Sequence, residues 1–241
     1  VLATANIINK SDGDPKAITQ QLSNQEVITQ VFQSLFELGE HFRFPEIATC
    51  ISSFIPLFNE MLLPFAAQLN AFMMQFLDLS IESFVSAKTT IDSVEFLVDI
   101  VMSSPAAQME FGPKICSDIF NILQNIEQSD LFDLLASVPP RLIETLPFSS
   151  NFWDVANMLM LRIQKDSSIS LHDPLYMISL FIFKDPNFAS QPLMPQIVTF
   201  CIEQMTHHLE EFDVWIEYAD LASNVLFGLN RNGATEPIHA M

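Results

Sequence analysis

The sequence predicts an all-α fold made of antiparallel helix pairs, and two observations carry this prediction. Apolar residues recur at spacings of three and four almost from end to end, as in Val27, Val31, Phe32 and Leu35, which is the pattern of amphipathic helices. Glycine occurs only five times and Tyr and Trp only twice each, while Phe, Leu, Ile, Met, Gln and Glu fill the long segments. This composition favours helix over sheet.

Capping residues and prolines set the expected helix boundaries. Ser23 followed by Glu26 forms a capping box, which places a helix start near Asn24. Later starts are marked by prolines, because the first turn of a helix tolerates a missing N–H. The expected helices, in chain order, span residues 24–41, 45–62, 64–83, 89–103, 105–125, 129–146, 151–165, 173–184 and 192–229, with the last segment either continuous or broken.

The spacing of four prolines predicts how these helices are grouped. Pro64, Pro105, Pro147 and Pro186 are separated by 41, 42 and 39 residues, which is the length of two helices and their turns in a HEAT-like repeat. We therefore expect helix pairs stacked as an α-solenoid. The alternative is an irregular helical bundle, because no residue motif repeats with these prolines.

The predicted division of the chain follows the periodicity. Residues 1–13 form an irregular tail, residues 14–229 form the HEAT-like helical repeat segment, and residues 230–241 form an irregular C-terminal tail. The chain begins with Val1 and shows no signal-peptide pattern, which is typical of an internal fragment or a processed chain. The longest uncharged stretch, residues 61–77, contains proline, glutamine and asparagine, so we expect no membrane span.

Net charge narrows the class of partner. Ten Lys and Arg against 29 Asp and Glu give a net charge of −19, which would repel the phosphates of nucleic acid. Direct nucleic-acid binding is therefore not expected. The same charge favours protein partners with basic segments, although simple solubility of the chain also accounts for it.

Motifs for catalysis or cofactor binding are missing from the sequence. There is no Gly-rich phosphate loop, no G-x-S-x-G and no H-E-x-x-H. His207 and His208 have acidic neighbours, but a solvated polar face explains them better than a metal site. The odd number of distant cysteines argues against disulfides and suits a reducing compartment, with the thiols in the core. We expect no enzyme, no cofactor and no metal.

Two rows of carboxylates are the candidate binding residues. At 100° per residue, the acidic side chains of the last predicted helix share one face, and we expect the opposite face to be core. The first row comprises Glu203, Glu210, Asp213, Glu217 and Asp220. The opposite face comprises Met205, Leu209, Phe212, Ile216 and Ala219. The second row comprises Asp92, Glu95 and Asp99, on a helix whose Val94, Leu97, Val98 and Val101 point elsewhere. A basic partner would relieve the repulsion within each row, while an ordinary solvated outer face is the alternative.

Residues 24–229 resemble the importin-β superfamily of nuclear transport receptors. The resemblance lies in acidic, Phe- and Leu-rich helix pairs of about 40 residues, as in FPEIATCISSFIPLFNEMLLPFAAQLNAFMMQFLDLSIESF (44–84) and TIDSVEFLVDIVMSSPAAQMEFGPKICSDIFNILQN (90–125). It implies a receptor of the nucleus and cytoplasm that binds cargo, a Ran-type GTPase and Phe-Gly nucleoporins. No residue of the chain matches a Ran-binding segment of that family.

Two other functions remain open from the sequence. One is a structural helical-repeat scaffold subunit of a large complex, which would co-purify with fixed partners. The other is a helical bundle in which Met73, Met74, Met158 and Met160 line a pocket for an apolar ligand, although core packing explains these methionines more simply.

Overall fold

The computed structural model describes residues 25–42, 50–51, 59–80 and 84–231. The predicted tail 1–13, residues 232–241 and most of the predicted helix 45–62 lie outside these residues. Within the described part the chain is all-helical, with no strand, which confirms the all-α prediction. The chain forms two compact units, residues 1–126 and 127–241.

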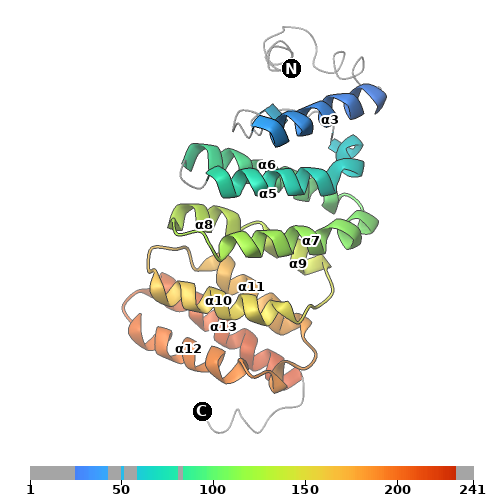
Figure 1. The fold of residues 1–241 in the computed structure, drawn as a ribbon. Helices are drawn as coiled ribbons and strands as arrows, with labels where there is room; N and C mark the ends of the chain where they lie inside the picture. Colours follow the sequence, from blue (N-terminus) through green and yellow to red (C-terminus); the bar gives the residue numbers. More distant parts are fainter. Residues whose placement is uncertain (1–24, 43–49, 52–58, 81–83, 232–241) are drawn as a thin grey trace. The chain divides into compact units, whose positions relative to one another are not determined.

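In the first unit, long helices lie side by side (Figure 1), and their core is rich in phenylalanine. Helices α5 and α6 pack against each other, and both contact α7. The rings of Phe32 and Phe65 stack with centroids 6.0 Å apart, and those of Phe36 and Phe72 meet edge to face at 5.6 Å. The described elements are α3 (Gln25–Phe42), the 3-10 helix η1 (Asn59–Phe65), α5 (Ala66–Ser80), α6 (Phe84–Met102) and α7 (Pro105–Leu123).

The second unit is built around one helix that contacts two others. Helix α11 packs against both α9 and α13, and α13 also packs against α12 (Figure 1). Helix α11 therefore packs on the second helix before it and on the second helix after it in the chain, and it also contacts α10 and α8. The elements are α8 (Ser129–Ala136), α9 (Pro139–Thr145), α10 (Asn151–Lys165), α11 (His172–Lys184), the 3-10 helix η2 (Phe188–Ser190), α12 (Met194–His207) and α13 (Phe212–Arg231).

A buried carboxylate fixes the connection that follows α11. Asp185 is 1% exposed. Its carboxylate accepts hydrogen bonds from Trp153 Nε1 at 2.9 Å, from the Asn187 backbone N–H at 2.7 Å and from Gln191 Nε2 at 2.6 Å. A buried carboxylate requires such donors because it has lost its water. The network holds α10, the end of α11 and the start of the following connection together.

Two expected helices are each divided in the structure. The segment predicted as 129–146 contains α8 and α9, separated at Ser137 and Val138. The reason is the Pro139–Pro140 pair, which lacks two N–H donors and so cannot continue the backbone hydrogen bonds of α8, although Val138 itself keeps helical backbone angles (φ −78°, ψ −49°). The segment predicted as 192–229 contains α12 and α13, separated by residues 208–211.

The break between α12 and α13 also overturns the predicted core side. We expected Met205, Leu209, Phe212, Ile216 and Ala219 to be buried. Instead, Met205 and Ala219 are half-buried, and the other three are 70%, 69% and 42% exposed. The turn resets the helical phase, so that α13 buries Tyr218, Leu221, Val225 and Leu229.

The cysteines behave as predicted, whereas only one of the four spaced prolines begins a helix, and Pro147 and Pro186 lie between helices. Cys50, Cys116 and Cys201 are buried free thiols, and burial raises the pKa of Cys116 and of Cys201 to about 12. Pro105 is the first residue of α7. Pro64, in contrast, lies inside η1.

Candidate protein-binding surface

Three of the five carboxylates in the first acidic row lie on α13, and the other two do not. Asp213, Glu217 and Asp220 belong to α13. Glu203 belongs to α12, and Glu210 is an exposed residue of the turn between the two helices. The row predicted on a single helix is therefore divided, although its α13 members remain on one side of that helix.

The α13 carboxylates line two adjoining hollows of the second unit. The larger hollow, about 670 Å³, lies beside the turns that precede α11 and α13, and Asp213, Glu217 and Glu211 line it. The smaller, about 330 Å³, lies between α11 and α13 and is lined by Glu217 and Asp220. Both are also lined by His172. We call the two hollows together the acidic groove.

The lining of the acidic groove carries negative charge without a matching cation. Among its lining residues, all within the described part of the chain, none is Lys or Arg. Two histidines are present: His172 Nδ1 lies 3.5 Å from Glu217 Oε1, and His208 Nδ1 lies 3.1 Å from Glu211 Oε1. No other basic side chain of the described residues lies in the lining of the two hollows. A Lys or Arg side chain placed in the groove would therefore be attracted.

The pKa of Asp173, a carboxyl beside the groove, also reflects the negative charge of the lining. Burial raises the pKa of Asp173 above its ordinary value; His172 opposes the rise and the charge of Glu217 adds to it. Like charges in a partly buried site disfavour ionisation. A bound cation would lower this pKa, because it would stabilise the ionised form.

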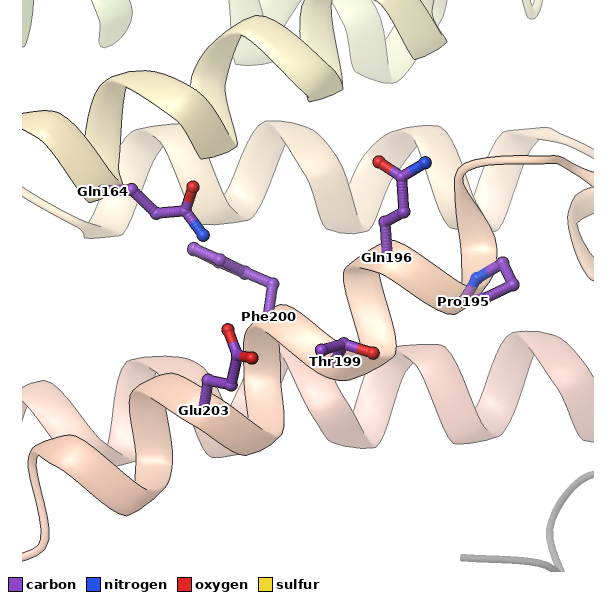
Figure 2. A pocket seen from close by; sticks show the side chains of 6 residues that line it. All are labelled: Gln164, Pro195, Gln196, Thr199, Phe200 and Glu203. Carbon is purple, nitrogen blue, oxygen red and sulfur yellow. The ribbon is translucent and has the colours of Figure 1, made fainter.

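Glu203 faces a different hollow. This hollow, about 290 Å³, is lined by Gln164 of α10 and by residues of α12, including Pro195, Thr199, Phe200 and Glu203. Figure 2 shows Gln164 reaching towards the Phe200 ring, with Glu203 one turn further along α12. Glu203 is the single acidic residue of this lining. The structure thus does not bring Glu203 into the acidic groove.

The second predicted row lies on α6 in the first unit. Val94, Leu97, Val98 and Val101 are buried on the other side, as predicted. Asp92 pairs with Lys88 at 3.2 Å, and both side chains are 48% exposed. Such exposed pairs contribute little to stability, but this one partly neutralises the row formed by Asp92, Glu95 and Asp99.

Side chains that the sequence did not single out also shape the acidic groove. His172, Tyr176, Ser179 and Asn224 line it. Asn224 Nδ2 donates to Ser179 Oγ at 3.0 Å, and Tyr176 OH donates to Glu144 Oε1 at 2.6 Å. One feature of the sequence could have indicated that α11 and α13 are related elements. The two helices start 40 residues apart, and each has an aspartate as its second residue.

The opposite ends of these helices are tied by basic side chains. Lys184, the last residue of α11, donates to the backbone oxygens of Glu144 at 3.0 Å and Leu146 at 2.7 Å. Arg231, the last residue of α13, donates to the backbone oxygens of Phe183 at 2.7 Å and Asp185 at 3.4 Å. In both cases a cation caps the negative C-terminal end of the helix two places earlier in the chain, which is α9 for Lys184 and α11 for Arg231. The same device recurs in two alternate helices, α11 and α13.

The remaining candidate residues were also placed. Trp153 is buried, whereas Trp215 is half-buried. Met73, Met74 and Met160 are buried in the core. Among the described residues, no group of three or more His, Cys, Asp or Glu could hold a metal ion. No helix in that same part of the chain is long and apolar enough to cross a membrane.

Comparisons of the chain with protein-family models, curated proteins and solved structures found no match. The importin-β resemblance and the solenoid arrangement therefore remain predictions from the sequence.

Proposed function

We propose that this chain is a protein-binding helical-repeat segment whose acidic groove receives a basic stretch of a partner protein. The observation that carries the proposal is the groove lining, where Glu211, Asp213, Glu217 and Asp220 gather without Lys or Arg. Charge complementarity of this kind raises association rates and selects against acidic partners. No covalent chemistry is involved.

The size of the groove supports side-chain recognition. A hollow of about 670 Å³ joined to one of about 330 Å³ is large enough for several extended Lys or Arg side chains. Tyr176, which is 40% exposed, adds aromatic surface to the lining, and aromatic faces attract cations. A basic peptide would therefore gain both charge pairing and packing.

We further propose that the partner is the cargo or Ran-type GTPase of a nuclear transport receptor. This part rests on the importin-β resemblance of residues 24–229, and Phe-Gly nucleoporins would be additional partners. A structural scaffold subunit would also bind proteins, but its binding would not depend on the nucleotide of a GTPase. Nucleotide dependence therefore separates the two functions.

The groove is tested by titrating the intact chain against a fluorescein-labelled peptide rich in Lys and Arg. In fluorescence anisotropy we expect saturable binding that weakens steadily with added salt. The Glu217→Gln/Asp220→Asn variant should weaken binding about three- to tenfold, because two partly exposed charge pairs are lost.

A matched variant controls for net charge. Glu110→Gln/Asp154→Asn removes the same two charges from exposed positions on α7 and α10, so the affinity should stay within about twofold if local contacts dominate over long-range fields. Equal weakening by both variants would refute the groove as the binding site. A separate pull-down tests the transport role, with the intact chain as bait and the Ran-type GTPase loaded with GTP or with GDP. If the chain captures the GTPase in neither state, Ran-type binding is refuted.

A further inference from the structure

The smaller hollow of the acidic groove differs from the larger one because an exposed tyrosine ring lines it. Tyr176 lines only the smaller hollow and is 40% exposed. The imidazole of His172 lies nearly parallel to this ring, with an interplanar angle of 12° and centroids 6.3 Å apart. The tyrosine of the larger hollow, Tyr218, is only 2% exposed. An aromatic face is therefore available to a ligand in the smaller hollow alone.

A hydrogen bond at the far end of the ring holds Tyr176 in place. Its hydroxyl donates to Glu144 Oε1 on α9 at 2.6 Å, and Glu144 is not part of the hollow's lining. The hydroxyl is thus engaged outside the hollow, while the ring lines it. A ring fixed in this way loses little conformational entropy when a flat group stacks on it.

Two carboxylates line the same hollow. Glu217 and Asp220 lie three residues apart on α13, a spacing that makes them neighbours on one side of the helix. His172 Nδ1 lies 3.5 Å from Glu217 Oε1, but an ionised carboxylate has about four acceptor sites on its two oxygens. Glu217 can therefore accept hydrogen bonds from a second donor group as well.

Of the two cationic side chains, arginine matches this lining better than lysine. A guanidinium is planar, stacks on aromatic rings and carries its N–H donors around its edge, where they fit carboxylates. An ammonium is a compact, strongly hydrated point charge. A guanidinium can therefore lie flat on the Tyr176 ring and donate to the carboxylates of Glu217 and Asp220 at the same time, which an ammonium cannot.

We propose that the smaller hollow is an arginine subsite, which takes one Arg side chain of the partner's basic stretch in preference to Lys. The assignment rests on the proposed binding of a basic partner in the acidic groove, and it specifies the chemistry of that partner. The guanidinium stacks on Tyr176 and donates to Glu217 and Asp220. The larger hollow has carboxylates but no exposed tyrosine ring, so it accepts Lys and Arg alike.

The preference is measured with two fluorescein-labelled peptides of equal length, spacing and net charge, one with only Arg and the other with only Lys as its basic residue. In anisotropy with the intact chain, the Arg peptide should bind about three- to tenfold more tightly. Tyr176→Leu should reduce this preference to less than about twofold, whereas Tyr176→Phe should keep it because the ring remains.

Two aspartates of α13 provide a matched pair of variants. Asp220 lines only the smaller hollow and Asp213 only the larger one, and both are exposed. Asp220→Asn should lower the preference for Arg by about twofold or more, because a partner of the guanidinium edge is lost. Asp213→Asn removes the same charge but should weaken both peptides equally and leave the preference unchanged. Melting temperatures show that each variant keeps the fold, and this pair tests the subsite independently of Tyr176.

The possible outcomes separate this inference from the function on which it rests. Equal affinity of the two peptides for the unmodified chain would refute the arginine subsite and leave the acidic groove as a general basic site. A preference for Arg that survives both Tyr176→Leu and Asp220→Asn would refute the assignment to the smaller hollow. No saturable binding of either peptide would refute the proposed function and this inference with it.

Discussion

Removing the Asp185 carboxylate should be among the most damaging single changes in the second unit. Asp185→Ala leaves the Trp153 indole N–H and the Asn187 backbone N–H without their acceptor, whereas the half-buried Gln191 amide can turn to water. An unsatisfied buried donor costs about 1–3 kcal/mol. Trp153 is buried whereas Asn187 is exposed, so the indole N–H is the one buried donor left unsatisfied, and the expected loss is about 1–3 kcal/mol.

Asp185→Asn sharpens the prediction because it keeps the shape of the side chain. The structure assigns Trp153 and Gln191 to one carboxylate oxygen and the Asn187 N–H to the other. An amide retains only one acceptor oxygen, so its NH₂ must face a donor. The expected loss is about 1–2 kcal/mol, between wild type and Asp185→Ala.

The assay is urea unfolding followed by tryptophan fluorescence and circular dichroism. Trp153 lies in the network and is one of only two tryptophans, so its emission reports directly on the site. Asp154→Ala, on the exposed side of α10, is the control and should change stability by less than about 0.5 kcal/mol. If Asp185→Ala costs no more than this control, the three-donor network does not stabilise the fold.

Three further predictions concern the helix contacts and buried groups of the same unit. Gly228→Ala places a methyl 2.7 Å from Ile182 Cγ2 and 3.1 Å from Phe188 Cδ1. This overpacking should outweigh the gain in helix propensity and lower the free energy of unfolding by about 1–2 kcal/mol, measured by urea unfolding. The double variant Gly228→Ala/Ile182→Leu should recover part of the loss. Stabilisation by Gly228→Ala would contradict the close contact. Burial raises the pKa of Tyr218 to about 12, and the charge of Cys201 adds to the rise. The unfolded chain therefore releases this proton at lower pH than the folded chain, so stability should fall as the pH rises from about 10 to 12, and Tyr218→Phe should flatten that slope. Burial also raises the pKa of Cys201 to about 12, so its thiol should resist iodoacetamide at pH 8 in the folded chain and react after unfolding in urea; fast labelling of the native thiol, read by peptide mass spectrometry, would disprove its burial.

Local features of the chain were predictable because local chemistry decides them. The helix at 151–165 has the predicted bounds, and Pro105 begins α7 as expected. Apolar spacing and the position of a proline act within one or two turns. A break within 192–229 was one of the alternatives from the sequence, but these signals did not locate the turn between α12 and α13, where the two helices fold back and bury Phe200 against Tyr218 with ring centroids 5.6 Å apart.

The candidate surface was predictable only in part, for a related reason. Glu217 and Asp220 were identified from helical geometry. Their closeness to His172, Tyr176 and Ser179 depends on partners about 45 residues away. The helical wheel also misassigned Leu209, Phe212 and Ile216 to the core, because it assumed one unbroken helix. No pattern within a single helix contains that information.

The basic side chains at the ends of α11 and α13 have a mechanical consequence. Arg231 ties the two helices together at their C-terminal ends, while the acidic groove separates parts of their N-terminal halves. The contact of His172 with Glu217 at 3.5 Å holds the two helices near their N-terminal ends as well. The walls of the groove are thus fixed at both ends, so a basic side chain would enter a preformed opening and lose little free energy to rearrangement of the protein.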